Sequence, residues 1–215
     1  MRPTSGRPRA VIFDCDGTLV DSESLGNEIL VEYVREFGLD LSLAETLERF
    51  RGCKMADCVR DLEQEMGTAL PDEFTEIYRQ RTFDQFAERL KPIDGALDVV
   101  KSVTLPKCVA SSAPLSKIEL SLRVTGLLPF FVGKLFSCYE IERWKPDPAV
   151  FLHAATVLET EPADCLVVED SEVGIQAGVA AGMQVVAFCS HGNTDFVPAN
   201  VPVITQLSEL KSYWS

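Results

Sequence analysis

No stretch of this 215-residue chain is apolar for long enough to cross a bilayer, which needs about 20 consecutive apolar residues. The first nine residues contain three arginines and no apolar run, so they lack the hydrophobic segment of a signal peptide. We therefore expect no membrane partner, and we predict that residues 1–9 form a short disordered tail.

Clusters of basic residues are also missing. The net charge is −13, whereas nucleic acids and anionic membranes are bound by grouped lysines and arginines. We therefore expect no nucleic-acid partner. The negative sign does not exclude an anionic small molecule, because a local site can oppose the charge of the whole protein.

The residues of a zinc site are scarce. The chain has two histidines, His153 and His191, and its seven cysteines include no C-x-x-C pair, so a zinc centre is not expected. The cysteines are odd in number, and several lie within apolar runs, where cysteine acts as a small hydrophobe. This pattern favours reduced thiols in the cytoplasm. We interpret both histidines as structural or surface residues.

Short β-rich runs are present, and they predict strands at residues 10–14, 107–110, 134–137, 165–169 and 184–188. After about residue 96, helical patterns separate these runs. Alternating strands and helices indicate a parallel sheet with helices on both faces. The sequence therefore predicts an α/β protein with a Rossmann-like core.

A long helical segment lies between the first two predicted strands. Hydrophobic residues recur at helical spacing before Gly38, which ends a first helix, and Ser42 and Glu45 form a capping-box pattern for a second. A third helix ends at Gly67, and Pro71 is placed to open a fourth. The predicted domains are a core of residues 10–21 and 92–215 and a helical insert of residues 22–91.

Polar residues of one chemical kind follow three of the predicted strands. The first strand leads into residues 14–18, Asp-Cys-Asp-Gly-Thr, the second into Ser111 and Ser112, and the fourth into residues 169–171, Glu-Asp-Ser. Lys145 lies in a proline-rich stretch just before a helix. Ligands bind at the carboxyl ends of parallel strands, so we expect these groups to surround one crevice.

This set of groups suits phosphoryl transfer. Asp14 and Asp16 are two residues apart, so on an extended backbone both side chains lie on the same side. One can attack the phosphorus while the other protonates the leaving oxygen and later activates water. A Mg²⁺ ion held by carboxylates and a lysine such as Lys145 would offset the repulsion between a carboxylate and a phosphate dianion.

These motifs, in this order, resemble those of the haloacid dehalogenase superfamily. Residues 14–18 look like its first motif, Ser111 its second, Lys145 its third, and residues 169–170 its fourth. The helical insert resembles the four-helix cap of the β-phosphoglucomutase-like branch. Two further stretches resemble the bacterial 6-phosphogluconate phosphatase subgroup, namely residues 50–55 and 143–148.

The resemblance implies a role for each matching position. Asp14 would be the nucleophile and Asp16 the general acid and base, with Mg²⁺ as the cofactor. The metal would be bound by the side chains of Asp14 and Asp170 and the carbonyl of Asp16, with support from Glu169. The phosphoryl oxygens would be held by Ser111, Ser112 and Lys145. The expected activity is hydrolysis of a sugar or sugar-acid phosphate through an aspartyl-phosphate intermediate.

Arg51 and Lys54 leave two interpretations open. A turn between two helices of the insert is naturally charged and solvated. In members of the family, however, this loop reaches over the active site, where two cations would favour an anionic substrate. We carry both residues forward as candidate specificity residues.

Other functions also stay open at this point. A sugar phosphomutase of the same branch would carry a histidine where this chain has Gly26 and an arginine near Met55. A receiver-type signalling module also uses aspartate, serine or threonine, and lysine around Mg²⁺, but it is shorter and has no insert. Glu169 and Asp170 could also serve simply as a helix N-terminus. For the phosphatase we expect a small-molecule phosphate ester as partner and a monomer or weak oligomer.

Overall fold

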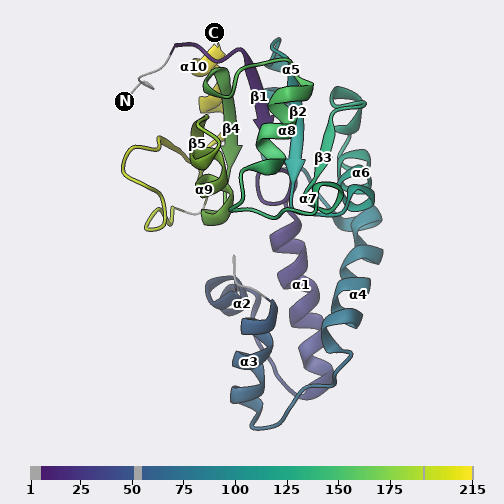
Figure 1. Cartoon of the computed structure of the whole chain (residues 1–215). Helices are drawn as coiled ribbons and strands as arrows, with labels where there is room; N and C mark the ends of the chain where they lie inside the picture. The colour runs from purple at the N-terminus through teal and green to yellow at the C-terminus, as the bar shows by residue number, and fades with distance from the viewer. Residues whose placement is uncertain (1–5, 51–54, 191, 215) are drawn as a thin grey trace. The chain divides into compact units, whose positions relative to one another are not determined.

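The computed structural model describes residues 6–50, 55–190 and 192–214, and the chain divides into two compact units (Figure 1). The described residues up to Val20 and from Lys91 onward form the core unit, and Asp21–Leu90 form the helical unit. Within the described ranges, no helix is both long enough and apolar enough to span a membrane.

The core unit is built on a six-stranded sheet whose neighbouring strands are all parallel, in the order β3-β2-β1-β4-β5-β6. This confirms the predicted α/β class. Five strands lie within one residue of their predicted bounds, whereas β6 was not predicted. The strands are β1 (Ala10–Phe13), β2 (Lys107–Ser111), β3 (Leu135–Ser137), β4 (Cys165–Glu169), β5 (Gln184–Phe188) and β6 (Val203–Ile204).

Helices cover both faces of this sheet, which is why its strands are apolar throughout rather than alternating. On one face, Ile12 joins a core cluster with buried side chains of α8 (Ala149–Val157) and α9 (Glu172–Ala180). On the other face, the ring of Phe13 packs edge-on against Phe131, with 6.1 Å between the ring centroids.

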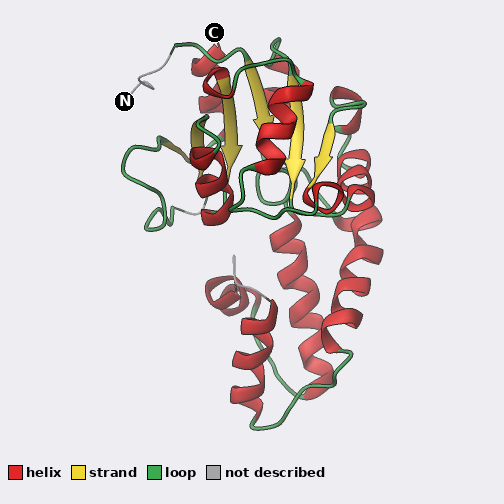
Figure 2. Cartoon of the chain, viewed as in Figure 1, coloured by secondary structure: helices red, strands yellow, loops and turns green. Residues whose placement is uncertain are grey.

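Short helices complete the core unit and connect its strands (Figure 2). They are α5 (Ala96–Ser102), α6 (Leu115–Val124), η2 (Leu128–Phe130), α7 (Cys138–Ile141), η3 (Pro162–Asp164), η4 (Leu207–Leu210) and α10 (Lys211–Trp214). All of the described cysteines are free thiols and are buried in one of the two units.

The helical unit has a hydrophobic core of its own, in which the ring of Tyr33 stacks on Phe74 at 4.7 Å. The predicted capping box is present, because Glu45 Oε2 accepts from Ser42 N (2.9 Å) and Ser42 Oγ accepts from Glu45 N (3.2 Å). Gly38 adopts a left-handed φ of 89° where the first helical stretch ends. The helices are α1 (Ser22–Val34), η1 (Arg35–Phe37), α2 (Leu43–Phe50), α3 (Met55–Met66) and α4 (Phe74–Arg89).

The N-terminal segment differs from the expected disordered tail at its described end. Arg9 N donates to Asp164 O at 2.7 Å, and the Gln184 side-chain amide donates to Gly6 O at 3.2 Å. Residues 6–9 are therefore attached to the core unit. Composition alone missed this because backbone hydrogen bonds leave no hydrophobic pattern.

Candidate active site

The candidate site lies where three adjacent strands end. In the sheet, β1 lies between β2 and β4, and the register pairs Phe13 with Val109 on one side and with Val168 on the other. Asp14 follows β1, Ser111 ends β2 and Glu169 ends β4. Parallel pairing therefore brings the three predicted polar segments to one edge of the sheet, as the sequence motifs required.

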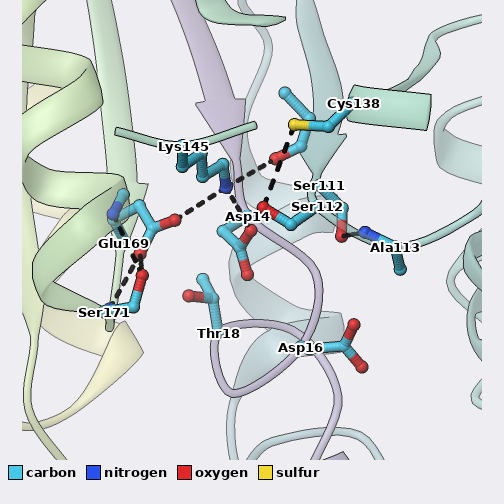
Figure 3. Close-up of polar contacts among 12 residues, drawn as sticks. Asp14, Asp16, Thr18, Ser111, Ser112, Ala113, Cys138, Lys145, Glu169 and Ser171 are labelled. Carbon is cyan, nitrogen blue, oxygen red and sulfur yellow. Dashed lines mark hydrogen bonds and ion pairs between the residues drawn. The ribbon is translucent and has the colours of Figure 1, made fainter. Parts of the chain in front are cut away.

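A buried lysine links two of these strand ends (Figure 3). Lys145 Nζ donates to Asp14 Oδ1 at 2.5 Å and to Glu169 Oε1 at 2.7 Å. It also donates to the carbonyl of Ala110 at 3.1 Å, so all three of its protons have an acceptor. The side chains of this ion-paired group are at most 9% exposed. Their charges are therefore screened little by water.

Burial changes how these groups titrate. Desolvation raises the pKa of Asp14 to about 8, because the lowering effect of Lys145 is outweighed and the nearby Glu169 and Asp16 add to the rise. For Lys145, burial lowers the pKa, but the carboxylates of Asp14 and Glu169 more than reverse this and hold it above the ordinary value. Lys145 therefore remains a cation, whereas the charged form of Asp14 is disfavoured in the metal-free site.

Glu169 is fixed by the start of α9. Its Oε2 accepts from Ser171 N (2.8 Å) and Ser171 Oγ (2.9 Å), and Ser171 in turn caps the helix by accepting from Gly174 N. A Cβ at position 174 would lie only 1.8 Å from Glu169 Oε1. Glycine at this position therefore leaves the space that the buried carboxylate occupies.

Asp170 is held against the turn that follows β1. Thr18 Oγ1 donates to Asp170 Oδ1 at 2.8 Å. Gly17 has a φ of +82°, and a Cβ there would lie 2.1 Å from Asp170 Oδ2. Two features of the Asp-Cys-Asp-Gly-Thr segment, the glycine and the threonine, thus place the Asp170 carboxylate beside the segment that carries Asp14.

Asp16 lies on the same turn, but its carboxylate points away from that of Asp14 (Figure 3). It contacts Lys117 of α6, whose Nζ lies 3.0 Å from each of the two carboxylate oxygens. Burial lowers the pKa of Lys117, but Asp16 outweighs this effect and the pKa ends above its ordinary value. Sequence reasoning missed Lys117, because one lysine in an amphipathic helix looks like any solvent-facing residue.

The two predicted serines lie at the end of β2. Ser111 Oγ accepts from Ala113 N at 3.1 Å, which shapes the turn after the strand. Ser112 Oγ lies 3.9 Å from Cys138 Sγ at the start of α7. Both serines are therefore near the carboxyl end of β2, close to the backbone carbonyl that Lys145 contacts.

The donor set suits a divalent cation. With all four carboxylates of the site ionised, its two ammonium groups leave two negative charges, which one Mg²⁺ ion would balance. Among the residues that the structure describes, no three Asp, Glu, His or Cys side chains are grouped as a metal site. The implied ligand set needs only two of them, Asp14 and Asp170, with the carbonyl of Asp16, and Mg²⁺ typically binds one or two carboxylates and several waters.

The remaining candidates lie elsewhere. Arg51, Lys54 and His191 fall outside the described residues. His153 packs edge-on against Phe136, with 5.2 Å between the rings, which agrees with a structural role.

Comparison with known proteins identifies a family and two similar phosphatases. The sequence profile described as haloacid dehalogenase-like hydrolase matches residues 11–188. The chain is 39% identical over 210 residues to 6-phosphogluconate phosphatase of Escherichia coli (strain K12), covering 97% of this chain and 95% of that protein. It is 31% identical over 186 residues to fructose-1-phosphate phosphatase YqaB of the same strain, covering 84% and 96%.

A solved structure extends the likeness to three dimensions. The haloacid dehalogenase-like protein ATU0790 of Agrobacterium tumefaciens, a protein of unknown function, superposes with a TM-score of 0.85 at 30% identity. The match covers 95% of this chain and 96% of that one.

Proposed function

Because this chain belongs to the haloacid dehalogenase-like hydrolases, we propose that it hydrolyses a small sugar or sugar-acid phosphate through an aspartyl-phosphate intermediate on Asp14. One observation carries the proposal. Asp14 is buried at the end of β1 and held at 2.5 Å by a lysine that itself lies between two carboxylates. A carboxylate kept in place beside a permanent cation is poised to meet a phosphate dianion.

Each step can be assigned to a residue of the chain. An oxygen of Asp14 attacks the phosphorus, and the bond from phosphorus to the leaving oxygen breaks. Asp16 donates a proton to that oxygen, so the product leaves as an alcohol. A water molecule then attacks the phosphorus while Asp16 takes a proton from that water. The bond between phosphorus and Asp14 breaks, which releases inorganic phosphate and restores the Asp14 carboxylate.

Other groups of the site hold charge in place during these steps. Lys145 offsets the negative charge of the phosphoryl oxygens, and Ser111 and Ser112 donate hydrogen bonds to them. We propose that Asp14 and Asp170 bind Mg²⁺ through their side chains and Asp16 through its carbonyl. When bound, Mg²⁺ supplies the positive charge that lets a carboxylate approach a phosphate dianion.

The sugar-phosphate class of substrate rests on the two phosphatases to which the chain is similar. In the proposed reaction, the core motifs would contact only the transferred phosphoryl group, so selectivity would come from other residues. That Arg51 and Lys54 supply it stays a prediction from the sequence.

The phosphomutase alternative is disfavoured within the helical unit. A Cβ at Gly26 would lie 2.8 Å from the hydroxyl of Tyr78, so that hydroxyl occupies the space beside the α1 backbone. A histidine at this position, as the related mutases carry, could enter only if Tyr78 moved. Hydrolysis is therefore the reaction that the residues support.

The test is a panel of phosphate esters with and without metal. With Mg²⁺ we expect phosphate release from 6-phosphogluconate and fructose 1-phosphate and little from nucleotides. Excess chelator should stop release and added Mg²⁺ should restore it. Asp14→Asn should lower turnover by more than about 10⁴-fold, as expected when a covalent nucleophile is removed. Near-normal turnover of that variant, or of chelated protein, contradicts the mechanism.

A further inference from the structure

Lys117 makes a contact whose geometry goes beyond neutralising charge. Its Nζ lies 3.0 Å from Oδ2 of Asp16 and equally 3.0 Å from Oδ1. An ammonium placed evenly between two carboxylate oxygens fixes the plane of that carboxylate, which is otherwise free to rotate because its terminal torsion has only broad minima. The pair is also partly shielded, with side chains 32% and 26% exposed.

The lysine comes from a rigid part of the core unit. It lies in the first turn of α6, where its backbone N–H donates to Pro114 O at 3.0 Å. The next residue, Ile118, and Leu122 one turn later are fully buried and anchor this helix. Asp16, in contrast, lies on the turn after β1, outside any helix or strand. Lys117 thus connects an anchored helix to a carboxylate on a turn.

We propose that Lys117 is a positioning residue for the general acid and base, and this inference rests on the proposed function. In an in-line displacement, the leaving oxygen departs on the side of the phosphorus opposite to Asp14. The carboxylate of Asp16 points away from that of Asp14 (Figure 3). Lys117 holds it there through the contacts at 3.0 Å. Lys117 therefore acts on the leaving group through Asp16, whereas Lys145 acts on the phosphoryl group.

The choice of leaving group separates these two roles. A sugar alkoxide needs a proton as it departs, whereas p-nitrophenolate is a stable anion and does not. A variant that only misplaces Asp16 should thus be slow on sugar phosphates and nearly normal on p-nitrophenyl phosphate in the first chemical step. For Lys117→Gln we expect kcat/KM on 6-phosphogluconate to fall by about 10- to 100-fold, the cost of misplacing a catalytic group by about 1 Å.

On p-nitrophenyl phosphate, kcat/KM should change by less than about threefold, since it reports the step that needs no acid. The second step still needs Asp16 as a base, so this variant should show a burst of p-nitrophenolate followed by slow turnover. Lys117→Arg keeps a cation and should lose less than Lys117→Gln. Lys101→Gln, at an exposed lysine of α5, is the matched control and should behave as the wild type.

A double-variant cycle decides whether Lys117 acts through Asp16. If it does, Asp16→Asn combined with Lys117→Gln should be no slower than Asp16→Asn alone. Additive losses would mean that Lys117 meets the substrate directly, and equal losses on both esters would mean general damage; either result overturns the inference. Asp14→Asn serves as the reference. If it abolishes turnover while Lys117→Gln matches the wild type on both esters, this inference fails and the proposed function stands.

Discussion

The core unit and the helical unit place their charged groups in different settings. In the core unit, Lys145 lies between Asp14 and Glu169, and all three side chains are nearly inaccessible to water. In the described part of the helical unit, the ion pairs lie at the surface, and those of Arg49, Arg81 and Arg89 join neighbouring helices. Arg49, for example, is 31% exposed, and it pairs at 2.8 Å with an Asp61 that is 51% exposed.

The two kinds of ion pair differ in what they contribute to stability. Exposed pairs contribute about 0–1 kcal/mol each, and they can be lost with little effect on the fold. Burying an ion costs several kcal/mol, which a good partner only partly offsets. Stability alone therefore does not explain the burial of Asp14, Lys145 and Glu169, whereas the phosphoryl transfer that we propose for this site would explain it.

Removal of the buried cation, Lys145, should have the largest effect on stability and activity. Lys145→Met keeps the side-chain volume but leaves Asp14 and Glu169 facing each other without compensation. We expect the free energy of unfolding at pH 8 to fall by about 3–5 kcal/mol, measured by urea denaturation, together with loss of turnover. Lys134→Met, at an exposed lysine of the same unit, is the control and should change stability little. Equal stability of the two variants would show that the buried group is not electrostatically coupled.

A second test moves the buried carboxylate without changing its charge. Gly174→Ala places a methyl group 1.8 Å from Glu169 Oε1, so the carboxylate must shift. Alanine has a higher helix propensity than glycine. We nevertheless expect overpacking to lower the free energy of unfolding by about 1–3 kcal/mol, and we expect kcat/KM to fall. Gly178→Ala in the same helix meets Val185 rather than the site, at 2.8 Å. If Gly174→Ala keeps full activity, the position of the Glu169 carboxylate is not critical for the reaction.

The third test uses the pH dependence of stability to detect the raised pKa of Asp14. Its pKa is raised from 3.8 to about 8, so the metal-free folded state binds a proton that the unfolded state has released. Stability is therefore lost as the pH rises between these values. The difference in unfolding free energy, Asp14→Asn minus wild type, should grow by about 1–3 kcal/mol from pH 5 to pH 9, and Mg²⁺ should reduce it. A difference that stays flat with pH would place the pKa near its ordinary value.

The smallest effect is expected at the surface of the helical unit. Asp61→Asn and Glu65→Gln each remove one carboxylate from Arg49 and leave the other in contact, at 2.7 and 2.8 Å respectively. Each should cost less than about 1 kcal/mol, and the cost should shrink further as salt is added. A loss of several kcal/mol would remove the distinction between the two units.

The sequence predicts the frame of this protein well because its strands are apolar on both faces. Runs such as residues 165–169 and 184–188 could be identified to the residue for that reason. The two-residue strand Val203–Ile204 was not predicted, since an edge strand this short has no periodicity to detect. The order of motifs along the chain predicted which strand ends would meet.

The connections between site residues could not be predicted in the same way. That Asp14 and Glu169 share Lys145 depends on side-chain reach across β1 and β4, which sequence spacing does not encode. The contact between Lys117 and Asp16 joins residues 101 positions apart. Neither segment signals this contact in the sequence, because a lysine in an amphipathic helix and an acidic turn are each common by themselves.

The two ends of the helical insertion are paired with each other in the core unit. Val20 and Pro92 form an antiparallel bridge, and Ile93 N donates to Leu19 O at 2.9 Å, so the two ends of the interruption are paired. A whole module can be exchanged between such ends while the strand register stays unchanged, because domain insertion is tolerated where chain ends lie close together. Asp14 and Asp16 lie before that insertion and Glu169 and Asp170 after it. Under the proposed function, an exchanged insert could change the choice of substrate while these carboxylates stay in place.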